Sequence, residues 1–189
     1  MISEYGYWTM NDKSQHGTDA GLAKALVKFF DKVDAISIYD FGCGDGFYTN
    51  YLYNEGFNIK GFDGNPHTPE LTNGFCEVQN LAEPFTMKPR EWIMSLEVAE
   101  HIPAQYQDIF IDNIVNHCKK GVIISWAVKG QGGYGHVNCK NNDEVIDLFT
   151  KKCFVLDKTN TDRLRDAVAL YPTPCYWFRD TLLVFRKGS

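Results

Sequence analysis

The stretch from Ile36 to Asn50, which reads ISIYDFGCGDGFYTN, constrains the fold more than any other part of this sequence. Ile36, Ile38 and Phe41 form a short apolar run with β-branched residues, which predicts a buried strand. The run stops at glycines, and apolar residues then return at helical spacing as Phe47, Tyr48, Tyr51 and Leu52. We therefore expect a strand that turns through glycines into a helix, so that backbone N–H groups and a helix N-terminus face a ligand.

An acidic residue stands at the end of each of the first two predicted strands. The first opens the pattern Asp40-x-Gly42-x-Gly44-x-Gly46, which is tighter than the Gly-x-Gly-x-x-Gly of dinucleotide-binding turns. The second, Asp63, follows a predicted strand over 58–62 and lies 17 residues after the last glycine. This is close to the spacing of about 20 residues in a βαβ nucleotide-binding unit. A carboxylate at this point accepts hydrogen bonds from both ribose hydroxyls, so loop and acid together predict a nucleoside site.

The loop and the acid resemble the nucleotide-binding region of class I S-adenosylmethionine-dependent methyltransferases. The resemblance implies S-adenosyl-L-methionine as cofactor and a Rossmann-like methyltransferase fold. Those enzymes often hold the adenine amine with an Asp after the third strand; here the residue is Asn80, whose amide oxygen accepts the same bond. The segment that follows Asp63 is expected to wrap the adenosine edge. The implied cofactor-binding residues are Asp40, Gly42, Cys43, Gly44, Gly46, Asp63, Gly64, Asn65, Asn80, Leu81 and Leu96.

The rest of the chain alternates between predicted strands and helices. We expect helices over 22–30, 106–114 and 143–151, and strands over 75–78, 92–96, 122–126, 154–157 and 182–186. The strand over 122–126 has almost no polar residue, as in a parallel sheet that is covered on both faces. This order predicts a doubly wound α/β sheet that is mostly parallel and has an antiparallel C-terminal strand.

Length and composition predict one globular domain over residues 1–189. No run of about 18 apolar residues occurs and the first residues form no signal peptide, so we expect a cytoplasmic location. The six cysteines are scattered without a Cys-x-x-Cys pair, which argues against a zinc cluster or a disulfide framework. Residues 1–17 are rich in aromatic side chains (Tyr5, Tyr7, Trp8), and two interpretations stay open for them: a hydrophobic strap over the core and a lid over the active site.

The distribution of charged residues indicates which class of molecule the chain binds. The net charge is −5, and basic residues form no dense block beyond short pairs such as Lys119-Lys120 and Lys151-Lys152. Nucleic-acid binding needs many cations, so a large nucleic-acid footprint is not expected. A small-molecule or saccharide acceptor is favoured, and the sequence does not indicate an oligomeric state.

A second group of candidate residues follows the strand over 92–96, in the pattern Glu97-x-x-Glu100-His101. Open α/β sheets present their active sites at this end of the strands. Residues three and four positions apart lie on one helical turn, so two carboxylates and an imidazole would converge on one cation. Oxygen ligands with one imidazole suit Mg²⁺ or Mn²⁺. His136, in the glycine-rich loop after the strand over 122–126, is the candidate for a further ligand.

This pattern resembles the metal-dependent O-methyltransferases, namely the small-RNA 2′-O-methyltransferases and the quinone-biosynthesis O-methyltransferases. In those families a Glu-x-x-Glu-His element, with a distal histidine in the RNA enzymes, holds a divalent ion. The resemblance implies metal-binding and catalytic roles for Glu97, Glu100, His101 and His136. Two alternatives stay open. The pattern Glu-His-Ile-Pro at a strand end also occurs in class I methyltransferases without a metal, where the first Glu contacts the cofactor and the His closes the pocket. His136 is equally interpreted as a loop histidine bonded to the backbone.

Other polar and aromatic residues carry weaker expectations. Three histidines stay unassigned, namely His16, His67 and His117. Two arginines, Arg163 and Arg165, are expected on a solvated helix face rather than in an anion clamp. The aromatic residues near the C-terminus are expected in the core or the pocket wall: Tyr171, Tyr176, Trp177 and Phe178.

The sequence thus predicts an S-adenosylmethionine-dependent O-methyltransferase that acts on a hydroxyl of a small polar or sugar-like acceptor, assisted by a divalent metal. One alternative is a metal-free small-molecule N- or O-methyltransferase. The other is a cofactor-binding module of a nucleic-acid modification complex. Whether activity depends on a metal distinguishes the first alternative from the main prediction. Whether the isolated chain turns over the cofactor with any acceptor distinguishes the second.

Overall fold

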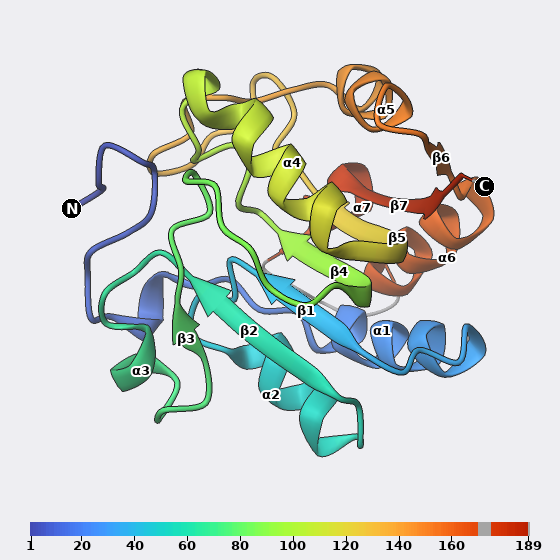
Figure 1. Ribbon diagram of the computed structural model, residues 1–189, viewed down its shortest axis with the longest axis horizontal. Coiled ribbons are helices and arrows are strands. Elements are labelled where there is room, and N and C mark those ends of the chain that lie inside the picture. Colours follow the sequence, from blue (N-terminus) through green and yellow to red (C-terminus); the bar gives the residue numbers. More distant parts are fainter. Residues whose placement is uncertain (170–174, 189) are drawn as a thin grey trace.

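The computed structural model describes residues 1–169 and 175–188 (Figure 1), and Tyr171 lies outside the described residues. The strands are β1 (Ile38–Phe41), β2 (Ile59–Asp63), β3 (Glu77–Val78), β4 (Arg90–Leu96), β5 (Cys118–Ser125), β6 (Phe154–Leu156) and β7 (Leu182–Lys187). The α-helices are α1 (Ala20–Lys32), α2 (Phe47–Asn54), α3 (Thr68–Leu71), α4 (Gln107–His117), α5 (Asn142–Thr150), α6 (Lys158–Ala169) and α7 (Phe178–Thr181). Short 3₁₀ turns occur at Lys13–Gln15 and Ala104–Tyr106.

The strands form one sheet in the order β3-β2-β1-β4-β5-β7-β6. From β3 to β5 every neighbouring pair is parallel. β7 lies between β5 and β6 and is antiparallel to both. This topology confirms the predicted doubly wound α/β sheet with an antiparallel C-terminal strand.

Two helical layers cover the sheet, one on each face (Figure 1). Successive residues of a strand face opposite layers. Ile93 therefore packs in one core with Phe110 of α4 and Phe149 of α5. Its neighbours Trp92 and Met94 pack in the other core with side chains of α1, α2 and α6. The burial of both faces explains why the central strands have almost no polar residues.

The ends of the strands differ from the sequence prediction. Ile36 was expected in the first buried strand, but its side chain is 70% exposed and this expectation is wrong. Pairing of β1 begins only at Ile38, opposite Ile59 of β2. β4 begins at Arg90, earlier than predicted, because the Arg90 guanidinium donates hydrogen bonds to the carbonyls of Ile38 (2.9 Å) and Asn58 (2.6 Å).

The arginines on α6 have different roles. Arg163 is exposed, as expected for a solvated helix face. The guanidinium of Arg165 instead donates to the carbonyls of Leu182 and Asp180, both at 2.8 Å. The expectation for Arg165 was therefore wrong, because its side chain ties α6 to the start of β7.

The segment 1–17 lies across the carboxyl ends of the parallel strands (Figure 1). The Asn65 side chain donates to the carbonyl of Met10 at 2.9 Å, and Gly6 lies against the backbone of His101. We call this segment the N-terminal strap. Among the described residues, no helix combines the length and the apolarity that a membrane span requires. The single domain and the cytoplasmic location stay predictions.

Candidate active site

The loop between β1 and α2 relies on backbone conformations that favour glycine. Gly42, Gly44 and Gly46 have positive φ angles of 86°, 56° and 79°. A Cβ atom on Gly42 would lie 2.2 Å from the side chain of Val98, so this position also excludes larger residues by contact. The Gly42 N–H donates to the carbonyl of Phe62 at 2.7 Å, which fixes the loop against the end of β2.

Asp63, the last residue of β2, organises this end of the sheet. One carboxylate oxygen accepts the N–H of Gly44 at 2.9 Å, and the other accepts the N–H of Asn65 at 2.9 Å. Each carboxylate oxygen has a second lone pair for a ligand hydroxyl. Asn80 makes a similar local bond, because its side-chain oxygen accepts the N–H of Ala82 at 3.0 Å.

Asp40 lies deeper than Asp63, with 3% of its surface exposed. The Thr49 hydroxyl donates to its carboxylate at 2.6 Å. Burial raises the pKa of Asp40 from 3.8 to about 7, although the hydrogen bond from Thr49 opposes this shift. A cation beside Asp40 would favour its charged form and so lower this pKa.

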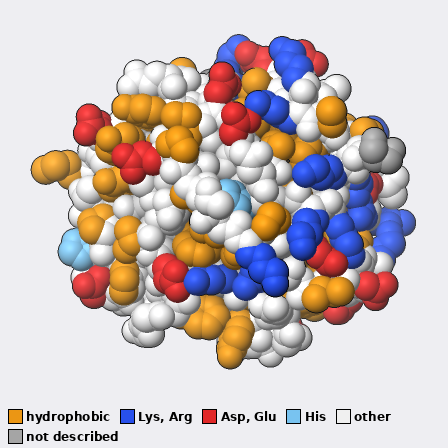
Figure 2. Space-filling view, in the orientation of Figure 1, with side chains coloured by type: hydrophobic (Ala, Val, Ile, Leu, Met, Phe, Trp, Pro, Cys, Tyr) orange, Lys and Arg blue, Asp and Glu red, His pale blue; other side chains and the backbone are white. Residues whose placement is uncertain are grey.

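These residues open onto a cavity of about 610 Å³. All the predicted cofactor-binding residues line it except Gly46, which lies behind the loop and begins α2 as its left-handed N-cap. Among the described residues that line the cavity there is no lysine or arginine. Figure 2 shows the basic side chains of one face gathered on the side of β6 and the C-terminus, away from the N-terminal strap. The lining includes these acids: Asp40, Asp45, Asp63, Glu97 and Glu100.

Glu100, His101 and His136 converge at one side of this cavity, with one potential ligand atom of each within 4.8 Å of the others. Nδ1 of His101 bonds the carbonyl of Gly135 at 3.2 Å, and Nδ1 of His136 bonds the carbonyl of Gln131 at 3.3 Å. Because a carbonyl only accepts, both Nδ1 atoms carry the proton, and each Nε2 keeps a lone pair when the ring is neutral. A backbone partner on the other ring nitrogen is typical of histidines that bind metals.

The carboxylate of Glu100 is fully buried, and within the described part of the chain neither oxygen has a hydrogen bond of ordinary geometry. Nε2 of His136 lies 4.0 Å from Oε1 of Glu100. Burial raises the pKa of Glu100 well above its usual value, and the charge of Glu97 raises it further. A buried carboxylate of this kind needs either a proton or a cation.

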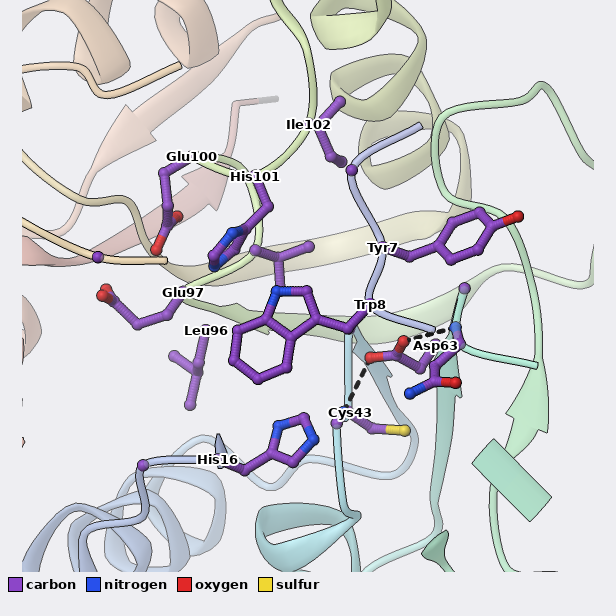
Figure 3. A pocket seen from close by; sticks show the side chains of 18 of the residues that line it. Tyr7, Trp8, His16, Cys43, Asp63, Leu96, Glu97, Glu100, His101 and Ile102 are labelled. Carbon is purple, nitrogen blue, oxygen red and sulfur yellow. Dashed lines mark hydrogen bonds between the residues drawn. The ribbon is translucent and has the colours of Figure 1, made fainter. Parts of the chain in front are cut away.

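Glu97 lies beside this group without belonging to it. Its carboxylate accepts hydrogen bonds from the Gln131 amide (3.1 Å) and the Thr181 hydroxyl (3.2 Å). Burial raises the pKa of Glu97 as well. Figure 3 shows the side chains of Glu97, Glu100 and His101 on one side of the cavity. A ligand role for Glu97 stays a prediction.

The segment from Glu97 to His101 was expected to form a helical turn, and this expectation is wrong. Glu97 has a φ of +54°, in the left-handed region, and its N–H donates to the Ser125 hydroxyl at 2.8 Å. The segment then makes turns closed by bonds such as His101 N–H to the Val98 carbonyl (3.0 Å). The helix α4 begins only at Gln107.

Burial also affects His101, whose pKa falls to about 4 because its imidazolium form is desolvated and lies near His136. Their ring centroids are 5.0 Å apart. His101 is therefore a neutral imidazole at physiological pH.

Two residues that line the cavity, Trp8 and His16, received no site role from sequence reasoning. Trp8 lies with its ring centroid 5.2 Å from that of His16 and 5.7 Å from that of His101. Figure 3 shows the Trp8 indole between these two imidazoles. Trp177 also lines the cavity, in agreement with its expected place in the core or the pocket wall. The aromatic run in residues 5–8 was the signal for Trp8, whereas nothing in the sequence pairs His16 with Trp177.

The other unassigned histidines lie outside this cavity. His117 is a structural residue, since its Nε2 accepts the N–H of Met87 at 3.0 Å and its Nδ1 bonds the carbonyl of Asn113. His67 is half-exposed beside Glu70 on α3. Neither contributes to the candidate site.

Comparison with known proteins places this fold in context. Residues 14–128, more than half of the chain, match a family model described as a methyltransferase domain. A comparison with curated protein sequences gives no match. The three solved structures described next share 11% to 16% sequence identity with the chain, so they show the fold alone.

These three structures are methyltransferases that have different names. Magnesium protoporphyrin IX methyltransferase from Synechocystis PCC 6803 with bound S-adenosylmethionine has a TM-score of 0.65 and 14% identity, covering 88% of this chain and 78% of the other. The methyltransferase domain of a bacterial Hen1 (CtHen1-C) has a TM-score of 0.60 and 16% identity, covering 88% and 97%. The plantazolicin methyltransferase BpumL, in complex with a pentazolic substrate analogue and S-adenosylhomocysteine, has a TM-score of 0.63 and 11% identity, covering 89% and 84%.

The parallel sheet, the glycine loop after β1 and the acid at the end of β2 agree with this family match. With more than half of its residues matched, the chain belongs to the methyltransferase-domain family of S-adenosylmethionine-dependent enzymes.

Proposed function

We propose that this methyltransferase is an O-methyltransferase that acts on a hydroxyl of a small polar or sugar-like acceptor, with the help of a divalent metal. The observation that carries the proposal is the convergence of Glu100, His101 and His136 on the cavity, with a buried carboxylate that has no hydrogen bond of ordinary geometry to the described residues. A divalent cation would satisfy this carboxylate and both Nε2 lone pairs.

The donor set bears on the metal. Two imidazole nitrogens and one buried carboxylate are softer than the oxygen ligands that Mg²⁺ prefers. Mn²⁺ accepts both kinds of ligand, so we favour Mn²⁺ over Mg²⁺. Glu97 would supply a second carboxylate. A divalent ion held by these residues would lower the pKa of an acceptor hydroxyl and would orient vicinal oxygens of the acceptor.

The chain's own residues perform the remaining tasks. The methyl carbon of the cofactor is already electrophilic, so catalysis needs mainly an in-line alignment of donor and acceptor oxygen. The carboxylate of Asp63 would receive the ribose hydroxyls, and the loop from Gly42 to Gly46 would lie under the cofactor. The N-terminal strap would exclude water above the transferred methyl group. When the C–S bond breaks and the C–O bond forms, the hydroxyl proton must pass to a base.

A metal-free methyltransferase is the second candidate, and one observation favours it. Nδ1 of His101 is bonded to the carbonyl of Gly135, so Nε2 carries the free lone pair of a general base. In that case His101 takes the hydroxyl proton, and Glu100 keeps a proton of its own.

One titration series tests the proposal. The protein, stripped with EDTA, is titrated with S-adenosylhomocysteine in a calorimeter, and methyl transfer from S-adenosylmethionine is then followed with nucleosides, monosaccharides and catechols. We expect cofactor binding without metal, turnover only after addition of Mn²⁺ or Mg²⁺, and the higher rate with Mn²⁺. Full turnover in EDTA would favour the metal-free candidate, and methylation of an amine but of no hydroxyl would contradict the proposal.

A further inference from the structure

Three residues that line the cavity each have one buried ring nitrogen without a hydrogen-bond partner within the described part of the chain. The atoms are Nε1 of Trp8, Nε2 of His16 and Nε1 of Trp177. A buried N–H without an acceptor costs about 1–3 kcal/mol, so native proteins rarely keep several in one place. Because all three residues line one cavity, we look for a ligand there that accepts hydrogen bonds.

The three residues line the same cavity as the glycine loop, although they come from distant parts of the chain. The imidazole of His16 lies directly on the loop, because its Nδ1 would be 2.6 Å from a Cβ atom on Gly44. The Trp8 indole lies beside this imidazole, at the ring distance of 5.2 Å. Trp177 approaches the residue next to His16, with Cζ2 3.3 Å from the Cβ position of Gly17. Figure 3 shows His16 across the cavity from Glu100.

The charge of the cavity restricts what these donors can bind. Its described lining has five acidic residues and no lysine or arginine. S-adenosylmethionine has a sulfonium, an ammonium and two ribose hydroxyls, all of which suit carboxylates such as Asp40 and Asp63. Its amino-acid carboxylate is its one anionic group, and no cationic side chain is available for that group among the lining residues.

We propose that Trp8, His16 and Trp177 bind the carboxylate of the cofactor's amino-acid tail through neutral N–H donors, in place of a basic residue. The indole nitrogens donate directly, and His16 donates as its Nε2–H tautomer. Inside a buried cavity such bonds are stronger than in water. The inference rests on the binding of S-adenosylmethionine by this chain.

The test compares two ligands that differ only at the tail. S-adenosylhomocysteine has the amino-acid carboxylate, whereas 5′-methylthioadenosine lacks the whole tail and keeps the adenine, ribose and sulfur. Calorimetric dissociation constants are measured for the wild type and for Trp177→Phe, Trp8→Phe and His16→Phe. We expect each variant to bind S-adenosylhomocysteine about tenfold more weakly, as for a lost hydrogen bond to a charged group. The dissociation constant of methylthioadenosine should change less than about twofold.

Two further variants serve as controls. Trp92→Phe removes another buried indole N–H without a partner, but Trp92 lies in the core outside the cavity, so both ligands should bind as to the wild type. His16→Gln keeps an N–H donor and should recover most of the affinity that His16→Phe loses. Circular dichroism confirms that each variant is folded at the temperature of the titration.

The outcomes are distinct. Equal weakening of both ligands would show that the substitutions distort the whole cavity, and unchanged binding of S-adenosylhomocysteine would show that the donors do not touch the tail. Either result overturns the inference while leaving the methyltransferase function in place. If the wild type binds neither ligand, the proposed function fails, and this inference fails with it.

Discussion

The carboxylate of Asp63 accepts the backbone N–H of Gly44 at 2.9 Å, so the last residue of β2 holds the glycine loop that follows β1. The two halves of the candidate cofactor site are therefore one hydrogen-bonded unit. The same carboxylate also bonds the N–H of Asn65, at the start of the segment expected to wrap the adenosine.

Asp63→Asn should weaken the binding of S-adenosylhomocysteine and of 5′-methylthioadenosine alike, by at least about tenfold. An Asn has one acceptor oxygen where Asp63 has two, so either the Gly44 or the Asn65 N–H loses its partner and a ribose hydroxyl loses a charged acceptor. Calorimetry measures both constants. Asp112→Asn, a substitution on α4 outside the cavity, should leave them unchanged. Unaltered binding by Asp63→Asn would remove Asp63 from the cofactor site.

Mn²⁺ should raise the thermal midpoint of the wild type and should not raise that of Glu100→Gln. At a metal concentration 100 times the dissociation constant, binding stabilises the folded state by about 2.7 kcal/mol, which corresponds to roughly 5–10 °C for a chain of this size. Differential scanning fluorimetry with EDTA and with Mn²⁺ measures the shift. Glu77→Gln, an exposed substitution on β3, is the control and should respond like the wild type. An equal shift in Glu100→Gln would exclude Glu100 as a ligand.

Stability should fall as the pH rises from 4 to 7, because of Asp40. The pKa of this carboxyl is raised from 3.8 to about 7 in the folded protein. In this window the folded state binds a proton that the unfolded chain does not, so a higher pH favours unfolding, by up to about 4 kcal/mol. Urea unfolding at several pH values measures this slope. The total loss of unfolding free energy between pH 4 and pH 7 should be smaller in Asp40→Asn by up to about 4 kcal/mol. An identical pH dependence in the two proteins would contradict the raised pKa of Asp40.

Gly6→Ala should loosen the N-terminal strap, whereas Gly56→Ala should not. The two glycines have nearly equal φ angles, +96° and +95°, so both substitutions carry the same backbone strain. Only a Cβ on Gly6 meets an obstacle, the His101 carbonyl at 2.1 Å, while Gly56 has nothing within 4 Å. Hydrogen exchange should therefore rise over residues 1–17 in Gly6→Ala alone, together with a loss of turnover. Full activity despite faster exchange over residues 1–17 would favour the interpretation of this segment as a hydrophobic cover of the core over its interpretation as an active-site lid.

The sequence predicted the parts of the site that local signals determine. The apolar run of β1, the glycines after it and the distance to Asp63 lie within 26 consecutive residues, from Ile38 to Asp63. Each signal has a direct backbone consequence, because a buried strand, a left-handed glycine and a βαβ spacing permit few alternatives. The observed topology confirms the predicted fold, and the family match confirms a methyltransferase domain, whereas the cofactor-binding roles of these residues stay a prediction.

The remaining parts depend on tertiary contacts that leave no local pattern. Glu97 is held in a left-handed conformation where the Ser125 hydroxyl accepts its N–H, so the predicted helical turn does not form. His16 and Trp177 are 161 residues apart in the chain and line one cavity because the strap folds over the strand ends. Such long-range placement follows from packing, which a hydrophobic period does not specify.

The place of β7 in the sheet has a consequence for how this enzyme is made. Its strand fits between β5 and β6, both of which leave the ribosome earlier. Until Leu182–Lys187 emerge, those two neighbours expose unpaired backbone edges that invite aggregation. The half of the sheet that carries the candidate cofactor site, from β1 to β4, is synthesised long before, yet the pairing of β5 and β6 is completed only by the final strand. A prematurely terminated product would thus carry the whole glycine loop and still be a target for chaperones and proteases.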